Sequence, residues 1–202
     1  MTEKDKSTEK QILEAAKKVF LEKGFDGARM QEIADEAGIN KALVHYYFRS
    51  KEKLFDAIFI EVFSGFFPKV FGAIFSDMSF EDKIAFFIDN YIDLLAENSF
   101  LPVFIIHEIN RNPEKIVGMM KNIGVDPKNL QFIFADIDKS KYKIIEPRHF
   151  MVNMLGLCIF PFIAKPILKG LLFNNSDIEY KAFLDQRKKI ITETVINSIR
   201  IK

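Results

Sequence analysis

The residues best suited to chemistry in this chain stand on one short predicted helix, from Lys41 to about Arg49. Lys41, His45 and Arg49 are spaced by four and share one face of that helix, while Ala42 and Tyr46 form the neighbouring row. An outward surface of an ammonium, a methyl, an imidazole and a phenol is small and rich in hydrogen-bonding groups. Such a surface suits base edges in a DNA major groove, where the N-terminal residues of a recognition helix reach deepest.

The segment before this helix has the pattern of its partner in a helix-turn-helix. Residues 30–37 carry apolar side chains at i, i+3, i+4 and i+7, which predicts a helix with one buried face. Gly38 tolerates the positive φ at which a helix stops, and Asn40 is a good N-cap for the next helix. Residues 24–53 therefore predict a complete helix-turn-helix.

Together with residues 15–25, this motif resembles the N-terminal domain of TetR-family transcriptional repressors. The resemblance covers about the first quarter of the chain, and we match no motif in the remainder residue by residue. The matching positions follow one another in the right order and fall on the right helices. They are Ala15, Ala16, Phe20, Gly24, Phe25, Ile33, Ala34, Ala37, Gly38, Ile39, Lys41, Tyr46, Tyr47, Phe48, Lys51 and Leu54.

Two positions depart from the family pattern. The family usually opens its second helix with Thr or Ser, as a cap and phosphate contact, but Ala28 stands here and Arg29 follows. We therefore expect Asp26 to cap this helix and Arg29 to supply the phosphate contact. Leu43 stands where the family often has a small polar residue, and it can make only apolar contacts, for instance to a thymine methyl. The operator sequence therefore cannot be carried over from a relative.

The predicted DNA contacts divide into side chains that face bases and side chains that hold phosphates. Those expected to face bases are Lys41, Ala42, Leu43, His45 and Tyr46. Those expected to hold phosphates and set the register are Arg29, Tyr47 and Lys51, and the N-cap Asn40 completes the surface. The chain as a whole has a net charge of only +1, but residues 39–53 hold four basic residues against one acidic residue. This distribution predicts a compact DNA footprint with modest non-specific affinity.

The rest of the chain also predicts helices, because no sustained alternation of period two is present. We expect an all-α protein, with a three-helix DNA-binding domain at 1–54 and a larger helical ligand-binding and dimerisation domain at 55–202. The helix that begins near Ser50 carries phenylalanine at every fourth position from Phe55 to Phe75, a ridge that winds around the helix. Pro68 lies inside this ridge and is expected to bend or break the helix, which would link the two domains mechanically.

Phenylalanine and methionine are concentrated in the predicted second domain. A packed core explains most of them, but soft, polarizable side chains also suit an adaptable pocket for an apolar or aromatic molecule. The family resemblance implies a ligand pocket in this region. We select Tyr91 and the His107–Glu108 pair as the polar groups to test as its orienting contacts. The candidate lining residues are Phe63, Phe67, Tyr91, Phe104, His107, Met120, Phe150 and Met154.

The apolar stretch from Met151 to Leu168 approaches the length of a membrane span, but Pro161, Lys165 and Pro166 interrupt it. We expect a buried interface helix rather than a membrane segment. Paired with the last predicted helix, at 177–199, it would form a symmetric four-helix contact between two copies of the chain. The family resemblance implies the same homodimer.

Signals for catalysis are poor. The three histidines do not have a metal-binding spacing, and no glycine-rich phosphate loop or serine-elbow motif is present. We predict no catalytic site, no metal and no cofactor. The polar N-terminus and the single cysteine, Cys158, indicate a cytoplasmic protein.

The combined prediction is a ligand-responsive, sequence-specific DNA-binding regulator, a repressor released from its operator by a small apolar or aromatic effector. One alternative is a helical carrier for a lipophilic molecule, in which the N-terminal motif is only structural. Another is a DNA-binding protein whose second domain only dimerises. A small-molecule enzyme ranks third.

Overall fold

The computed structural model describes residues 3–126, 128, 130–135, 137–143 and 145–201, and at 3, 4, 107, 130 and 131 it describes the backbone alone. Every named element in these residues is a helix, which confirms the predicted all-α class. The helices are α1 Glu3–Gly27, α2 Met30–Glu36, α3 Lys41–Phe48, α4 Lys51–Ile74, α5 Phe80–Glu97, α6 Leu101–Arg111, α7 Pro113–Asn122, α8 Leu130–Ile133, α9 Pro147–Ile163, α10 Lys165–Leu172 and α11 Asp177–Ile199.

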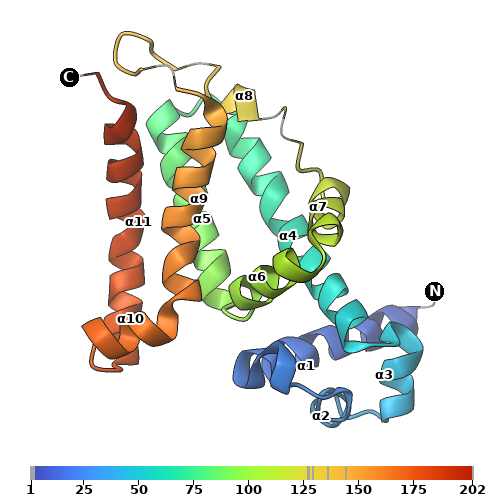
Figure 1. Cartoon of the computed structure of the whole chain (residues 1–202). Helices are drawn as coiled ribbons and strands as arrows, with labels where there is room; N and C mark the ends of the chain where they lie inside the picture. The colour runs from blue at the N-terminus through green and yellow to red at the C-terminus, as the bar shows by residue number, and fades with distance from the viewer. Residues whose placement is uncertain (1–2, 127, 129, 136, 144, 202) are drawn as a thin grey trace.

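Helices α1, α2 and α3 form a small bundle at one end of the molecule (Figure 1). The residues that sequence periodicity places inward are buried there, including Ile33 and Ala34 on α2 and Val44 and Phe48 on α3. The chain leaves helical geometry at Gly24, where φ is 69° and ψ is 174°, and Gly38 has φ 66° between α2 and α3. Both glycines therefore occupy backbone conformations that other residues rarely adopt.

Helix α4 leads from this bundle into the rest of the molecule and runs unbroken from Lys51 to Ile74 (Figure 1). Of the bend or break expected at Pro68, the break is thus absent, although the proline removes one backbone hydrogen bond. Phe63, Phe66 and Val70 are buried on both sides of this position and hold the helix in place by packing. Length and composition alone would also let α4 cross a bilayer, but eight of its residues are buried, so α4 is a core helix.

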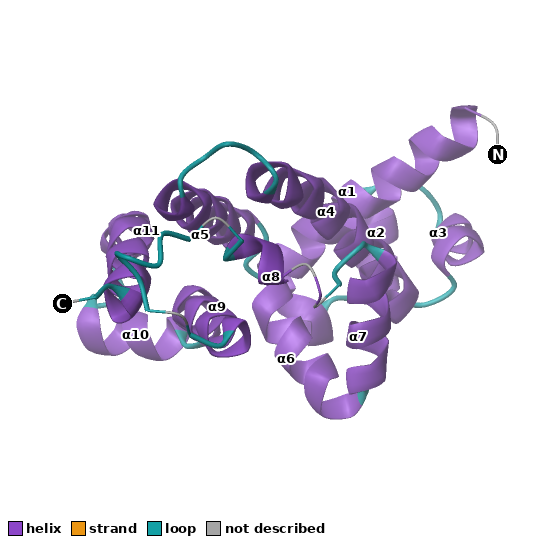
Figure 2. Cartoon of the chain, turned by 90° about the horizontal axis from the view of Figure 1, so that it is seen from above, coloured by secondary structure: helices purple, strands orange, loops and turns teal. Residues whose placement is uncertain are grey.

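Helices α5, α9 and α11 pack together beside α4, and α9 and α11 lie side by side in both views (Figures 1 and 2). Pro161 is buried near the end of α9, and the chain turns by 71° between α9 and α10. The Tyr180 hydroxyl of α11 donates a hydrogen bond of 2.5 Å to the Pro161 carbonyl in this corner. The tyrosine thus satisfies a buried carbonyl where the helix ends.

A cluster of aromatic rings, the junction cluster, joins α1, α4 and α6. The Phe55 ring stacks on Phe104 with centroids 3.3 Å apart, and the Phe25 ring meets them edge-on at 5.6 and 4.5 Å. Phe20 and Phe100 close the cluster, with centroids 5.8 Å apart. Phe104, a candidate ligand contact from the sequence, therefore packs where the bundle meets α6.

Beside the junction cluster, an ion cluster joins α7 to α4 and α6. The Lys115 ammonium lies 2.6 Å from Asp56 Oδ1 and 3.3 Å from Glu108 Oε2, and Glu108 is only 3% exposed. Burial opposes the Lys115 charge, but the two carboxylates outweigh it and raise the pKa of Lys115 above its usual value. The three charged side chains thus hold α7 against α4 and α6.

Replacing Tyr180 by Phe should leave the Pro161 carbonyl buried without its donor. We expect a loss of about 1–2 kcal/mol in the free energy of unfolding, measured by urea denaturation. Tyr46→Phe is the matched control, because the Tyr46 side chain is 77% exposed. Equal stability of both variants would contradict the assigned hydrogen bond.

Candidate DNA-binding surface and effector cavity

Helix α3 presents the predicted base-facing residues on its outer side. The Asn40 side chain accepts a hydrogen bond of 2.8 Å from the Leu43 amide, so Asn40 is the N-cap as predicted. Lys41, Ala42 and Tyr46 are exposed, whereas Leu43 and His45 are partly buried. The His45 ring nitrogen Nδ1 lies 3.1 Å from the Arg49 carbonyl, which leaves Nε2 free of this contact. The helix therefore offers an ammonium, a methyl and a phenol to the outside, with an imidazole beside them.

Helix α2 is capped differently from the expectation. Its N-cap residue is Arg29 rather than Asp26, because the Glu32 carboxylate accepts a hydrogen bond of 3.0 Å from the Arg29 amide. The bond from the Lys23 ammonium and this amide lower the pKa of Glu32, so the carboxylate is charged at neutral pH. The Arg29 side chain is exposed at the same end of α2. Its guanidinium remains available for the predicted phosphate contact.

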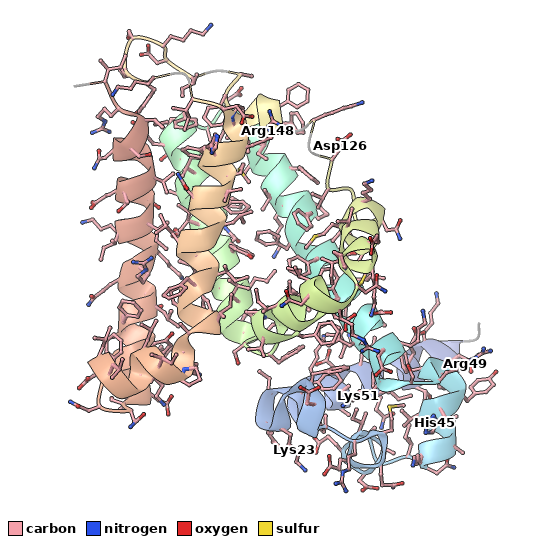
Figure 3. The ribbon with its side chains drawn as sticks, viewed as in Figure 1. Lys23, His45, Arg49, Lys51, Asp126 and Arg148 are labelled. Carbon is pink, nitrogen blue, oxygen red and sulfur yellow. The ribbon has the colours of Figure 1, made fainter. Side chains whose placement is uncertain are left out.

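Lys51 is engaged within the chain (Figure 3). Its ammonium donates to the carbonyls of Phe25 and Ala28 at 2.6 and 3.1 Å, and lies 4.4 Å from the centroid of the Phe25 ring. It ties the end of α1 to the start of α4. The predicted phosphate contact of Lys51 would have to compete with these bonds.

Tyr47 is also held inside the bundle. Its hydroxyl donates to Asp5 Oδ1 at 3.2 Å, and desolvation together with this carboxylate raises the pKa of Tyr47. The phenol therefore keeps its proton at neutral pH, and it can donate to a DNA phosphate only by giving up Asp5.

A cavity of about 390 Å³ lies between α4, α5, α7, α8 and α9. Four of the eight residues predicted from the sequence to line a ligand pocket do line this cavity, namely Phe63, Phe67, Tyr91 and Met120. The other lining residues are Phe66, Val70, Phe71, Ile74, Phe87, Val125, Asp126, Ile133, Arg148, Met151, Val152 and Leu155. Asp126 and Arg148 are the only charged residues on this lining among the described side chains, and they lie at the same end of the molecule (Figure 3).

The remaining candidates lie elsewhere. Phe150 packs against Phe80 and Phe134, with ring centroids 6.0 and 5.1 Å apart, and Met154 is buried on the same side of α9. The helix turns by about 100° per residue, so their sequence neighbours Met151 and Leu155 face the cavity instead. The side chain of His107 lies outside the described residues.

The lining on α4 could have been found from the sequence. Its members Phe63, Phe67, Phe71 and Ile74 follow one another at spacings of four, four and three along one face of the helix. Arg148 and Asp126 carried no sequence signal, because single charged residues near helix ends are common.

The outer sides of α9 and α11 carry exposed apolar residues. Val152 and Phe160 on α9 are 68% and 58% exposed, and Ile190 on α11 is 48% exposed. A shallow groove of about 360 Å³ runs between the two helices, and Gly156 stands on its wall. Apolar side chains exposed in this number along two adjacent helices are typical of a protein interface.

An all-helical chain with a helix-turn-helix at one end and an apolar cavity in the other part has the architecture of a one-component transcriptional regulator. The model of the family "Bacterial regulatory proteins, tetR family" matches residues 12–58. The helix-turn-helix end of the chain thus matches the TetR family, and the curated and structural neighbours are transcriptional regulators of that family.

Relatives extend the likeness to the full length. The chain is 24% identical over 189 residues to a probable HTH-type transcriptional regulator of Bacillus subtilis, YttP, covering 90% of this chain and 91% of that protein. It is 29% identical over 86 residues to the fatty acid metabolism regulator protein of the same organism, covering 43% of this chain and 44% of that protein. A solved structure, the putative fatty acid metabolism regulator of Clostridium perfringens, superposes with a TM-score of 0.66 at 19% identity, covering 95% of this chain and all of the other. The relatives are transcriptional regulators and not enzymes, which confirms the prediction that this chain is not an enzyme.

The different surroundings of Arg29 and Lys51 predict different effects on DNA binding. Arg29→Ala removes an exposed guanidinium and should weaken binding and reduce the slope of log K against log salt by about one, because each phosphate contact releases about one counterion. Lys51→Met should lower the melting temperature and leave that slope unchanged, because the Lys51 ammonium donates hydrogen bonds to the carbonyls of Phe25 and Ala28 rather than to DNA.

Anisotropy titrations at several salt concentrations measure the slope, and circular dichroism measures the melting temperature. A Lys51→Met variant that melts like the wild type but loses one unit of slope would show that Lys51 binds phosphate instead.

Proposed function

We propose that this protein is a homodimeric, sequence-specific repressor that leaves its operator when a small apolar or aromatic effector enters the cavity. Residues 1–54 bind the operator, and residues 55–202 hold the effector and the dimer contact. The observation that carries the proposal is the continuity of α4. The helix starts in the core beside α1 with Leu54 and Phe55, and it lines the cavity from Phe63 to Ile74.

The DNA contacts are those of the α3 face. Lys41, Ala42, Leu43, His45 and Tyr46 face bases, and Arg29 and Tyr47 hold phosphates, with Lys51 chiefly supporting the α1–α4 joint. One such face covers a single half-site. A two-fold dimer reads two half-sites whose centres lie about 34–36 Å apart, or a multiple of that distance.

The dimer contact uses α9 and α11, together with α10 between them. A two-fold interface needs projections and hollows on the same surface. Val152 and Phe160 supply the projections, and the groove beside Gly156 supplies the hollow. Burial of these side chains between two copies explains why they are apolar.

The effector is largely apolar because its cavity is. A volume of about 390 Å³ falls within the range of small-molecule sites, and most of the lining is aromatic or aliphatic. Two similar proteins bear names that link them to fatty acid metabolism, which supports an effector with a substantial hydrocarbon part. Such a molecule would touch Phe67 and Phe71 on α4 directly.

Release from DNA follows from a difference in affinity between two states. An effector that fits the cavity better when α4 is displaced shifts the protein towards a state with wrongly spaced recognition helices. Operator DNA must then weaken effector binding by the same factor as the effector weakens operator binding. Cytoplasmic location follows from this function.

The test is an anisotropy titration against duplexes that tile the DNA upstream of the protein's own gene, with and without 2-acetylnaphthalene. We expect saturable binding to one tile, at least tenfold weaker for Lys41→Ala, and a further loss when a probe saturates the cavity. Lys181→Ala is the matched control, because it removes the charge of an exposed lysine on α11, away from α3, and should leave operator affinity unchanged.

Each alternative has its own outcome. Probe binding without binding to any tile at low salt would favour a lipophilic carrier. Operator affinity untouched by a bound probe would favour a DNA-binding protein whose second part only dimerises. Equal, steeply salt-dependent binding to all tiles would be the non-specific phosphate contribution and would contradict sequence specificity on that DNA.

A further inference from the structure

Tyr91 is a largely buried residue with a polar group on the wall of the cavity. Tyr91 lines the cavity and is 8% exposed, and its ring packs against Phe66 and Phe87 with centroids 5.8 and 5.6 Å apart. No hydrogen bond joins its hydroxyl to any residue that the structure describes. It is the only hydroxyl-bearing side chain on the described lining.

The other buried tyrosines show that this is unusual for the chain. The Tyr180 hydroxyl donates to the Pro161 carbonyl, and the Tyr142 hydroxyl donates to Glu81. The half-buried Tyr47 donates to Asp5. Buried hydroxyls are paired in most folded proteins because an unpaired one loses its hydration without compensation. The Tyr91 hydroxyl thus differs from them, because it borders the cavity with its hydrogen-bonding capacity unused by the described residues.

The surroundings of Tyr91 determine the charge of a partner for this hydroxyl. The described charged residues of the lining are Asp126 and Arg148, and Arg148 is in the first turn of α9. The Phe80 ring at the start of α5 packs 6.0 Å from Phe150, two residues from Arg148, and Tyr91 is eleven residues or about 16 Å further along α5. Desolvation raises the pKa of Tyr91, so the phenol keeps its proton and acts as a donor. An anion beside the Tyr91 hydroxyl would lose its hydration, and the one described cation of the lining, Arg148, stands in the first turn of α9.

We infer that the effector carries an uncharged oxygen acceptor, such as a carbonyl or hydroxyl oxygen, on an apolar body, and that the Tyr91 hydroxyl donates a hydrogen bond to it. This inference rests on the proposed function, because it takes the cavity as the effector site. It adds the chemical class of the effector and its orientation. The oxygen points to the inner part of the cavity at Tyr91, and the apolar body lies against the phenylalanines of α4.

Two probes of nearly equal shape test the inference. 2-Acetylnaphthalene carries a ketone where 2-ethylnaphthalene carries a methylene group, and calorimetric titration of the purified full chain gives the affinity of each. We expect Tyr91→Phe to reduce the ketone-to-hydrocarbon affinity ratio about tenfold, mainly by weakening the ketone. Tyr180→Phe is the matched control, because it removes a buried hydroxyl outside the lining and should leave the ratio unchanged.

A second measurement needs no ligand. Since Tyr91 has no partner among the described residues, Tyr91→Phe should keep or raise the melting temperature of the free protein, whereas Tyr180→Phe should lower it. An unchanged affinity ratio, failure of the wild type to bind either probe, or a melting temperature lowered as in Tyr180→Phe would each overturn the inference. None of these measurements involves DNA, so a failure of operator binding would contradict the proposed function separately.

Discussion

The packing of α4 along one continuous hydrophobic core, from the bundle to the cavity, is the constraint on which the rest of the structure depends. Its first turns bury Leu54 and Phe55 against α1 and α6, and its later turns bury Phe63 and Phe66 against α5. A displacement of this helix therefore disturbs aromatic contacts at both ends. Close-packed interiors tolerate such shifts as alternative arrangements rather than as gradual deformation.

Two kinds of contact hold the bundle to the remainder, and they respond differently to movement. The stacked rings of Phe55 and Phe104 can slide at modest cost, because dispersion is not strongly directional. The Lys115 ammonium between Asp56 and Glu108 cannot move far, because separation would leave buried charges unpaired. Helix α7 carries both Lys115 and the cavity residue Met120. The ion cluster thus connects the cavity wall to the first turns of α4.

Local sequence patterns predicted the helices and the outward face of α3, because periodicity, glycines and caps act over a few residues. The features that local patterns did not predict depend on distant contacts. Pro68 does not break α4 because packing on both sides outweighs one lost hydrogen bond. Lys51 is held by carbonyls more than twenty residues away, which its spacing in the motif could not reveal. On α9, the adjacent residues Phe150 and Met151 face different surroundings: Phe150 packs in the core, and Met151 lines the cavity. Sequence periodicity alone did not distinguish these two faces.

The internal use of Lys51 has a consequence for how the protein would find its site in a genome. A lysine whose ammonium donates its hydrogen bonds to backbone carbonyls releases no counterion from DNA. The chain as a whole also has a net charge of only +1. Encounters with unrelated DNA would then be brief. A protein that dissociates quickly from wrong sequences spends less time trapped on them and explores distant segments by repeated diffusion through solution. Search speed and site preference would both favour a binding face with few phosphate contacts.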